Sequence, residues 1–175
     1  MRVVYTLTGG TKLLLVFPSV KTLEGLAHYY FSKNFIDMIV KISEDKKDVV
    51  NPKDIFEILS SVLKKEDKVD QDKEHFWVFH LDVRNRIKVL ELVSLGSLNA
   101  SLVHPREVFT RAVGERSAQV IIAHNHPSGE PTPSEDDIVL TKRLVKAGEI
   151  LGIELLDHIV ITQSSFTSFK EKSLI

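Results

Sequence analysis

The stretch IIAHNHPSGEPTPSEDD, residues 121–137, joins the most apolar run of the chain to the start of a long amphipathic segment. Alternate residues of a strand point to the same side of a sheet, so His124 and His126 project together if the apolar strand continues through them. Pro127 ends the ladder of hydrogen bonds, and Gly129 permits a tight turn. The chain therefore leaves a buried strand with two imidazoles, turns, and enters a helix.

That helix is predicted over residues 134–152, SEDDIVLTKRLVKAGEILG, with Ser134 as its N-cap. Asp137 lies one turn before the buried stripe begins, so its carboxylate faces the sheet that carries the histidines. Asp136 is rotated away and is predicted to face solvent. The buried stripe is predicted to consist of Leu140, Leu144, Ala147 and Leu151.

A carboxylate that faces a core is costly unless a charged group meets it. Two imidazoles and one carboxylate with an open fourth position form a common ligand set of catalytic zinc. His124, His126 and Asp137 are therefore candidate metal ligands. Two alternatives stay open from the residues alone: Ser134 and Asp137 form only a capping box, or the histidines are solvated polar residues at a strand end.

Composition places few limits on the function. The chain has 175 residues, 43% of them hydrophobic and 27% charged, as expected of a globular protein with one main core. The net charge of −1 is not the basic balance of a protein that grips nucleic-acid phosphates. The absence of cysteine excludes disulfides and thiolate ligands. No stretch reads as a signal peptide or membrane span, so we expect a cytoplasmic protein without membrane contact.

From residue 74 onward strands and helices alternate, which predicts an α/β domain in which helices flank a mixed sheet. Strands are predicted at 74–83, 86–95, 118–123, 153–161 and, at an edge, 165–169; helices at 51–65, 104–115 and 134–152. The first helix is predicted to bury Ile55, Ile58, Leu59 and Val62, and the second Val108, Phe109, Ala112 and Val113. His158, in the last long strand, is predicted to be a hydrogen-bonded core histidine.

The first part of the chain, residues 1–45, is predicted to be a small accessory module with a ββαβ order, ahead of a domain of residues 51–175. Its strands are predicted at 2–7, 12–17 and 35–42, and its helix at 19–34. Residues 43–50 are predicted to form a polar linker, and the charge run at 64–74 a solvated connection.

The motif His124-x-His126, followed by Ser134-x-x-Asp137 after a seven-residue gap that begins with Pro127, resembles the JAMM (MPN) metalloprotease motif. The stretches SLGSLNASLVHPREVFTRAV, AHNHPSGEPTPSEDD, LGIELLDHIVI and SFTSF together resemble the RadC branch of that family. The resemblance covers about residues 51–175. It does not extend to the first 45 residues, which do not look like the helix-hairpin-helix segment that RadC proteins commonly carry.

The resemblance implies a JAMM/MPN domain, a curved mixed sheet flanked by helices and related to the cytidine-deaminase architecture. It implies Zn²⁺ as cofactor, with His124, His126 and Asp137 as ligands and Ser134 as a residue that stabilises the oxyanion. It also implies an upstream glutamate that acts as general acid/base. The best match is Glu74, and Glu91 is the alternative.

The function implied is that of a zinc metallopeptidase or isopeptidase acting on a protein or peptide, with ubiquitin-like proteins among the candidates. The family's traditional label of DNA repair gives an alternative, a DNA-processing accessory protein or nuclease. A non-catalytic MPN scaffold is a further alternative. The sequence does not determine the substrate or the oligomeric state.

Overall fold

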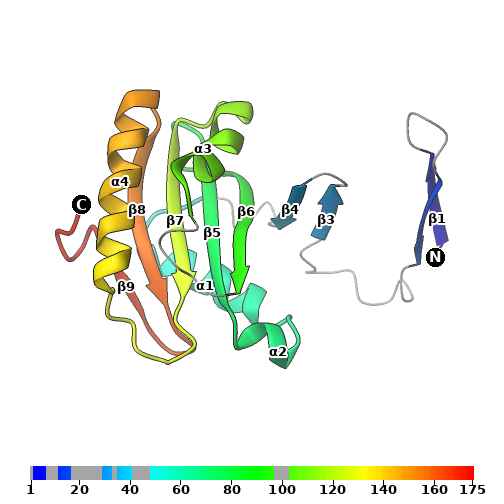
Figure 1. Ribbon diagram of the computed structural model, residues 1–175, viewed down its shortest axis with the longest axis horizontal. Coiled ribbons are helices and arrows are strands. Elements are labelled where there is room, and N and C mark those ends of the chain that lie inside the picture. Colours follow the sequence, from blue (N-terminus) through cyan, green and yellow to red (C-terminus); the bar gives the residue numbers. More distant parts are fainter. Residues whose placement is uncertain (1, 7–11, 17–28, 33–34, 41–47, 97–102) are drawn as a thin grey trace.

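The computed structural model describes the backbone of residues 2–6, 12–16, 29–32, 35–40, 48–96 and 103–175, and side chains in the last two ranges (Figure 1). The helices are α1 (Pro52–Leu63), α2 (Lys68–Gln71), α3 (Pro105–Gly114) and α4 (Glu135–Leu151). The strands are β1 (Arg2–Thr6), β2 (Lys12–Val16), β3 (Tyr29–Ser32), β4 (Phe35–Val40), β5 (Glu74–Leu81), β6 (Ile87–Gly96), β7 (Gln119–Asn125), β8 (Glu154–Ile161) and β9 (Phe166–Ser168).

The main sheet is mixed, as predicted. Its strand order is β3-β4-β6-β5-β7-β8-β9, and β1 pairs with β2 in a separate hairpin. Strands β7 and β8 run parallel, whereas the other neighbours in the main sheet are antiparallel. A parallel pair needs a crossover, and α4 supplies it. Strand β7, which carries His124 near its end, is therefore connected to α4, whose first turn contains Asp137.

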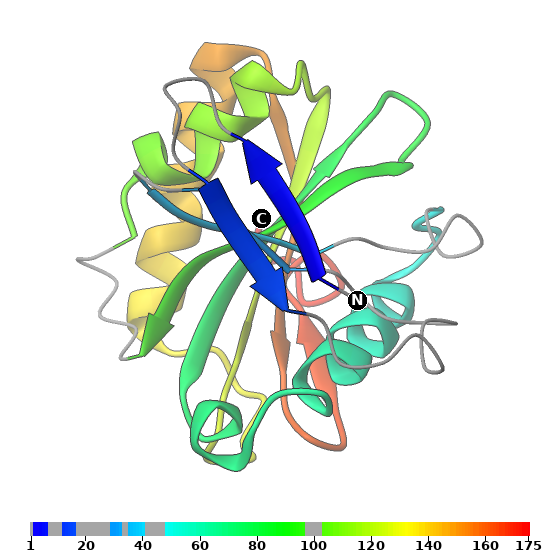
Figure 2. The ribbon, with the colours of Figure 1, turned by 90° about the vertical axis from the view of Figure 1, so that its right-hand side faces the viewer.

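The sheet lies between two helical layers (Figure 2). Helices α3 and α4 cover one face, over a core that includes Phe76, Val78, Ile122 and Leu144. Helix α1 covers the other, over a core that includes Trp77, Phe79, Ile121 and Ile159. Neighbouring residues of β5 and β7 alternate between the two cores, which is the period of a strand buried on both sides.

The N-terminal prediction is wrong at one element. Residues 29–32, expected to end a helix, form strand β3, which pairs with β4. The strands predicted at the start of the chain and at 35–42 are confirmed. The rest of the predicted helix lies outside the described residues. Because β4 also pairs with β6, residues 35–40 extend the main sheet; the division into residues 1–45 and 51–175 stays a prediction.

Helix α1 begins where its sequence predicts. The Asn51 side chain accepts a hydrogen bond from the backbone N–H of Asp54, whose carboxylate accepts one from the backbone of Asn51 in return. The charge run that follows is more than a solvated connection. It contains the short helix α2, and Glu66 Oε2 lies 2.8 Å from Nε2 of the buried His75.

The two longer helices on the other face each bury a slightly different stripe from the one predicted. Val113 is 56% exposed because the buried side of α3 ends at Ala112, one position earlier on the helix. Leu151 is 48% exposed, since it is the last residue of α4 before the left-handed Gly152. Burial on α4 instead includes Gly148. The remaining buried residues are Leu140, Thr141 and Leu144 on α4, with Val108, Phe109 and Ala112 on α3.

Replacing Gly148 by alanine is expected to destabilise the protein by about 1–3 kcal/mol, because a Cβ there would lie 2.4 Å from the backbone oxygen of Ile153. Gly114→Ala is the matched control: a Cβ at this helical position meets nothing within 4 Å, so we expect a gain of about 0.5–1 kcal/mol. Urea denaturation of both variants measures the two effects. Equal stability of the two would contradict the packing at Gly148.

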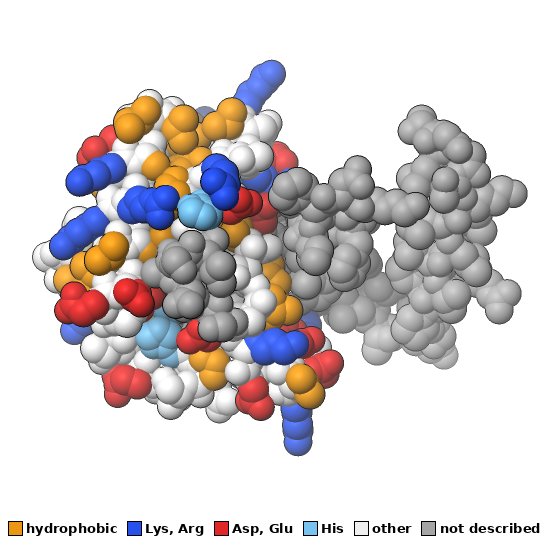
Figure 3. Space-filling model, in the orientation of Figure 1, with side chains coloured by type: hydrophobic (Ala, Val, Ile, Leu, Met, Phe, Trp, Pro, Cys, Tyr) orange, Lys and Arg blue, Asp and Glu red, His pale blue; other side chains and the backbone are white. Residues whose placement is uncertain are grey.

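The described surface over α3 and α4 carries charges of both signs, interspersed with apolar side chains (Figure 3). The exposed basic residues of these helices are Arg106, Lys142, Arg143 and Lys146, and exposed acidic residues of α4 are Glu135, Asp136 and Glu149. No helix among the described residues combines the length and the apolar character needed to cross a membrane.

Candidate metal centre

The two histidines stand where β7 leaves the sheet. His124 is 1% exposed, pairs with Phe76 of β5, and its ring stacks on the Phe76 ring. His126 follows the strand, and its backbone N–H donates to the carbonyl of Ile161 on β8 over 2.8 Å. The next turn closes through Gly129, whose φ of 84° lies in the left-handed region. The histidines are thus held by strands on both sides of β7.

Asp137 faces these histidines from the first turn of α4, and it also forms the capping box that was one of the alternatives. Ser134 and Asp137 form a full capping box: Ser134 Oγ accepts from the N–H of Asp137 (3.1 Å), and Asp137 Oδ2 accepts from the N–H (2.8 Å) and hydroxyl (2.6 Å) of Ser134. The box fixes the carboxylate, whose Oδ1 lies 3.4 Å from Nε2 of His124.

The three predicted ligands therefore converge on one point. One candidate ligand atom from each of His124, His126 and Asp137 lies within 4.8 Å of the others. Nε2 of His124 is 2.9 Å from Nε2 of His126, which is 3.7 Å from Asp137 Oδ2. Two imidazole nitrogens at this separation repel through their lone pairs unless a proton or a metal ion lies between or beside them. The set of two nitrogens and one carboxylate oxygen fits Zn²⁺.

The charges of the cluster are tightly coupled. Burial alone would raise the pKa of Asp137, but the neighbouring imidazoles of His124 and His126 and the hydrogen bond from Ser134 outweigh it and hold this pKa well below its usual range. The hydrogen bond to Asp137 raises the pKa of His126 against the effect of burial, and the negative charges of Asp137 and Glu74 add to the rise. The site therefore favours a negative charge on Asp137 and a positive charge at His126, which a divalent cation also supplies.

The far side of each histidine ring is anchored. His126 Nδ1 lies 2.8 Å from the carbonyl of Glu130. His124 Nδ1 lies 2.8 Å from Nε2 of His158, whose Nδ1 lies 2.6 Å from Oγ1 of Thr141. Burial, and secondarily the neighbouring His124, lowers the pKa of His158 well below its usual value. The prediction that His158 is a hydrogen-bonded core histidine is confirmed. Its position in the sequence did not indicate that His124 is the partner.

Asn125, between the two histidines, is a functional candidate that the sequence did not indicate. Its side chain bonds to the backbone on both sides of Glu74: Nδ2 donates to the carbonyl of Lys73 (2.9 Å), and Oδ1 accepts from the N–H of His75 (2.6 Å). Asn125 is 4% exposed, so these bonds are protected from water. The strand that carries the histidines thereby fixes the start of β5.

Glu74 is the first residue of β5, as predicted. By alternation it lies on the same face as Phe76, which is paired with His124. Its charge contributes, after the larger effect of Asp137, to the raised pKa of His126. Glu74 therefore lies at the start of the strand next to β7, on the face of the sheet that carries His124, and it is not among the candidate ligands.

Glu91, the alternative general base, is already engaged in a buried charge network. Its Oε2 lies 2.9 Å from Nε2 of His80, and its Oε1 lies 3.0 Å from Nε of Arg111. Glu91 is 5% exposed, and its strand β6 is separated from β7 by β5. This arrangement suits a group that secures α3 to the sheet better than one that exchanges protons with a substrate.

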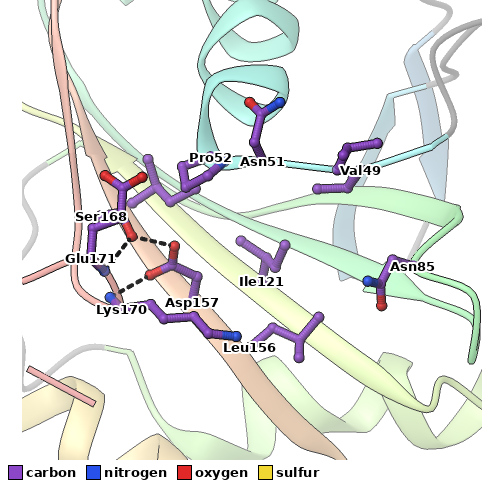
Figure 4. A pocket seen from close by; sticks show the side chains of 12 residues that line it. Val49, Asn51, Pro52, Asn85, Ile121, Leu156, Asp157, Ser168, Lys170 and Glu171 are labelled. Atoms are coloured by element: carbon purple, nitrogen blue, oxygen red, sulfur yellow. Dashed lines mark hydrogen bonds between the residues drawn. The ribbon is translucent and has the colours of Figure 1, made fainter. Parts of the chain in front are cut away.

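Two cavities differ in their relation to the cluster. A cleft of about 280 Å³ opens beside His126. Its polar lining includes the charged Lys64 and Asp72 as well as Ser60, Gln71, Asn125, Thr162 and Gln163. A cavity of about 350 Å³ on the α1 face is lined in part by Asp157, Ser168 and Lys170 (Figure 4). There the Asp157 carboxylate accepts from the Ser168 hydroxyl and from the backbone N–H groups of His158 and Lys170, so it ties β9 to β8.

Comparison with known proteins gives matches over most of the chain. The family model described as RadC-like JAB domain matches residues 49–174. A UPF0758 protein of Desulforamulus reducens is 54% identical over 110 residues, which are 63% of this chain and 48% of that protein. A UPF0758 protein of Methanosarcina mazei is 45% identical over 134 residues, 77% of this chain and 56% of that protein. The chain thus spans about half the length of these curated relatives, whose names state no activity.

Proposed function

This chain belongs to the family of RadC-like JAB domains, and we propose that it is a zinc-dependent hydrolase that cleaves an amide bond of a peptide or isopeptide. Metal-dependent hydrolysis is the coarser activity that the family supports. The finer assignment to zinc and to amide substrates rests on the described residues, and above all on one observation: two imidazole nitrogens and a carboxylate oxygen converge within 4.8 Å.

Zinc, when bound by His124, His126 and Asp137, supplies a Lewis acid that lowers the pKa of a water toward about 7 and polarises a carbonyl. Glu74 is proposed as the general base that accepts a proton from the attacking water and delivers it to the leaving amine. Its place at a strand start, fixed through Asn125, suits a carboxylate that must reach a proton without binding the metal.

Ser134 is proposed to stabilise the oxyanion, but its hydroxyl also has a local partner. It donates to Asp137 Oδ2 at 2.6 Å and accepts from the Asp137 N–H. The same hydroxyl would have to redirect its hydrogen toward a substrate oxygen. Holding Asp137 in place is therefore its role in the fold, and oxyanion stabilisation its proposed role in the reaction.

The cleft beside His126 supports a peptide as substrate. The exposed Gln163 side-chain amide on its lining can donate to and accept from an extended peptide backbone, whereas the Asn125 amide is already bonded to Lys73 and His75. The nucleic-acid alternative has less support, because the described surface over α3 and α4 mixes basic with acidic side chains (Figure 3). Ubiquitin-like proteins stay among the proposed partners, as carriers of a cleavable tail.

The test combines metal content with substrate cleavage. Purified untagged protein is expected to hold about one zinc per chain by elemental analysis and to hydrolyse peptide or isopeptide-linked test substrates. A chelator should remove the activity, and zinc should restore it. Zinc-loaded protein that cleaves no amide but binds DNA in a salt-dependent manner would overturn the proposal in favour of the DNA-processing alternative. Failure to take up zinc at all would favour the scaffold.

A further inference from the structure

The geometry points to His158 and Thr141 as positioning residues that hold His124 in the one tautomer able to bind a metal through Nε2. This inference rests on the proposed zinc site and adds two residues to it. Neither touches the candidate metal position: His158 lies behind His124, and Thr141 lies one turn after Asp137 on α4. Both are fully buried.

The direction of each hydrogen bond follows from the groups themselves. The Thr141 hydroxyl lies 2.6 Å from the carbonyl oxygen of Asp137, and a carbonyl only accepts, so the hydroxyl hydrogen points there. The remaining contact of Thr141 Oγ1, 2.6 Å from His158 Nδ1, must then be one in which the hydroxyl oxygen accepts. The proton of His158 therefore sits on Nδ1.

The proton of His124 follows from its contact with His158. Complete burial favours a neutral His158 ring, which carries a single N–H, so its Nε2 is an acceptor. The partner of this acceptor, at 2.8 Å, is Nδ1 of His124, which must donate. A neutral His124 that is protonated at Nδ1 presents a bare lone pair at Nε2, the atom that faces His126 and Asp137.

The chain of bonds also connects two candidate ligands. It starts at the His124 ring, passes through His158 and the Thr141 hydroxyl, and ends on the backbone carbonyl of Asp137. The His158 ring is held in this position by stacking on Phe169, with ring centroids 4.4 Å apart. Metal-binding histidines generally donate their second N–H to a carboxylate, carbonyl or water. Here a second imidazole, oriented by a helix hydroxyl, takes that place.

The first measurement is the tautomer of His158 in zinc-loaded wild-type protein, read from the ¹⁵N chemical shifts of its ring. We expect protonation at Nδ1 and not at Nε2. Protonation at Nε2 would overturn the inference, because His158 would then donate to His124. This readout needs no substitution and does not depend on hydrolysis.

The second measurement is zinc affinity by competition with a chromophoric chelator. Thr141→Val removes the hydroxyl at nearly constant shape and is expected to weaken zinc binding by about 10–100-fold. Thr141→Ser restores the hydroxyl and should stay within about threefold of wild type. Ser168→Ala deletes another buried hydroxyl, which bonds Asp157 on the α1 face, and should leave zinc affinity unchanged.

Asp137→Asn separates a failure of the positioning role from a failure of the proposed zinc site. If Asp137→Asn weakens zinc binding but Thr141→Val does not, the positioning role is wrong and the zinc site stands. If Asp137→Asn itself has no effect, the proposed zinc site fails. An equal loss in Thr141→Val and Ser168→Ala would also overturn the positioning role, because it would reflect general loosening of the fold.

Discussion

Glu74→Gln is expected to keep zinc and to lose hydrolysis by a factor of about 10²–10⁴, the usual contribution of a general acid/base. Glutamine preserves the shape of the side chain but cannot accept a proton from water. Asn125 holds the strand start through its bonds to Lys73 and His75, which the substitution leaves in place, so the strand start should be unchanged. The measurement is the steady-state rate on the peptide substrate identified for the wild type, at equal zinc content.

Glu91→Gln is the matched control, because it makes the same change at the other carboxylate considered. We expect a loss of stability, since the variant weakens the buried interactions with His80 and Arg111, and zinc binding like that of wild type. A fully active Glu74→Gln enzyme, or an inactive Glu91→Gln enzyme that is as stable as wild type, would show that Glu74 is not the base.

Asp137→Asn is expected to lower zinc affinity by at least about 100-fold. The substitution removes the negative charge of one of three candidate ligands, whereas the asparagine oxygen can still accept from the Ser134 N–H and so start the helix. His126→Ala removes a nitrogen ligand and should have an effect at least as large. Elemental analysis after dialysis and chelator competition measure the loss.

Asp136→Asn controls for the charge itself. Asp136 is exposed and adjacent in the same helical turn, so this variant removes the same charge from the first turn of α4 without touching the cluster. It should bind zinc like wild type. A metal content near one zinc per chain in both Asp137→Asn and His126→Ala would contradict the ligand assignment.

The sequence alone was sufficient to locate the candidate site because each step relied on a local rule. Strand alternation predicted that His124 and His126 share a side, and capping chemistry predicted that α4 starts after Ser134. Helical periodicity turned Asp137 toward the sheet. The structure agrees on all three placements. The mixed sheet with flanking helices followed in the same way, from the alternation of strands and helices.

The sequence was less informative wherever burial depends on a neighbour. Periodicity placed Val113 and Leu151 inside, but the first lies just outside the buried side of α3 and the second at the very end of α4. Residues 29–32 form a strand although their pattern favoured a helix, and they pair with β4. A strand acquires its hydrogen-bond partners from another segment, and local propensity does not report which segment that is.

Only the tertiary structure shows which residues contact the candidate ligands from the side away from the metal position. His158 meets His124 because β8 pairs with β7, and Thr141 meets His158 because α4 crosses over that pair. Asn125 fixes the backbone around Glu74 because β5 lies on the other side of β7. The sequence determined which groups are able to hold a metal, since ligand chemistry belongs to single residues. Only the pairing of strands distant in sequence determined what orients those groups, since that is a property of the assembled sheet.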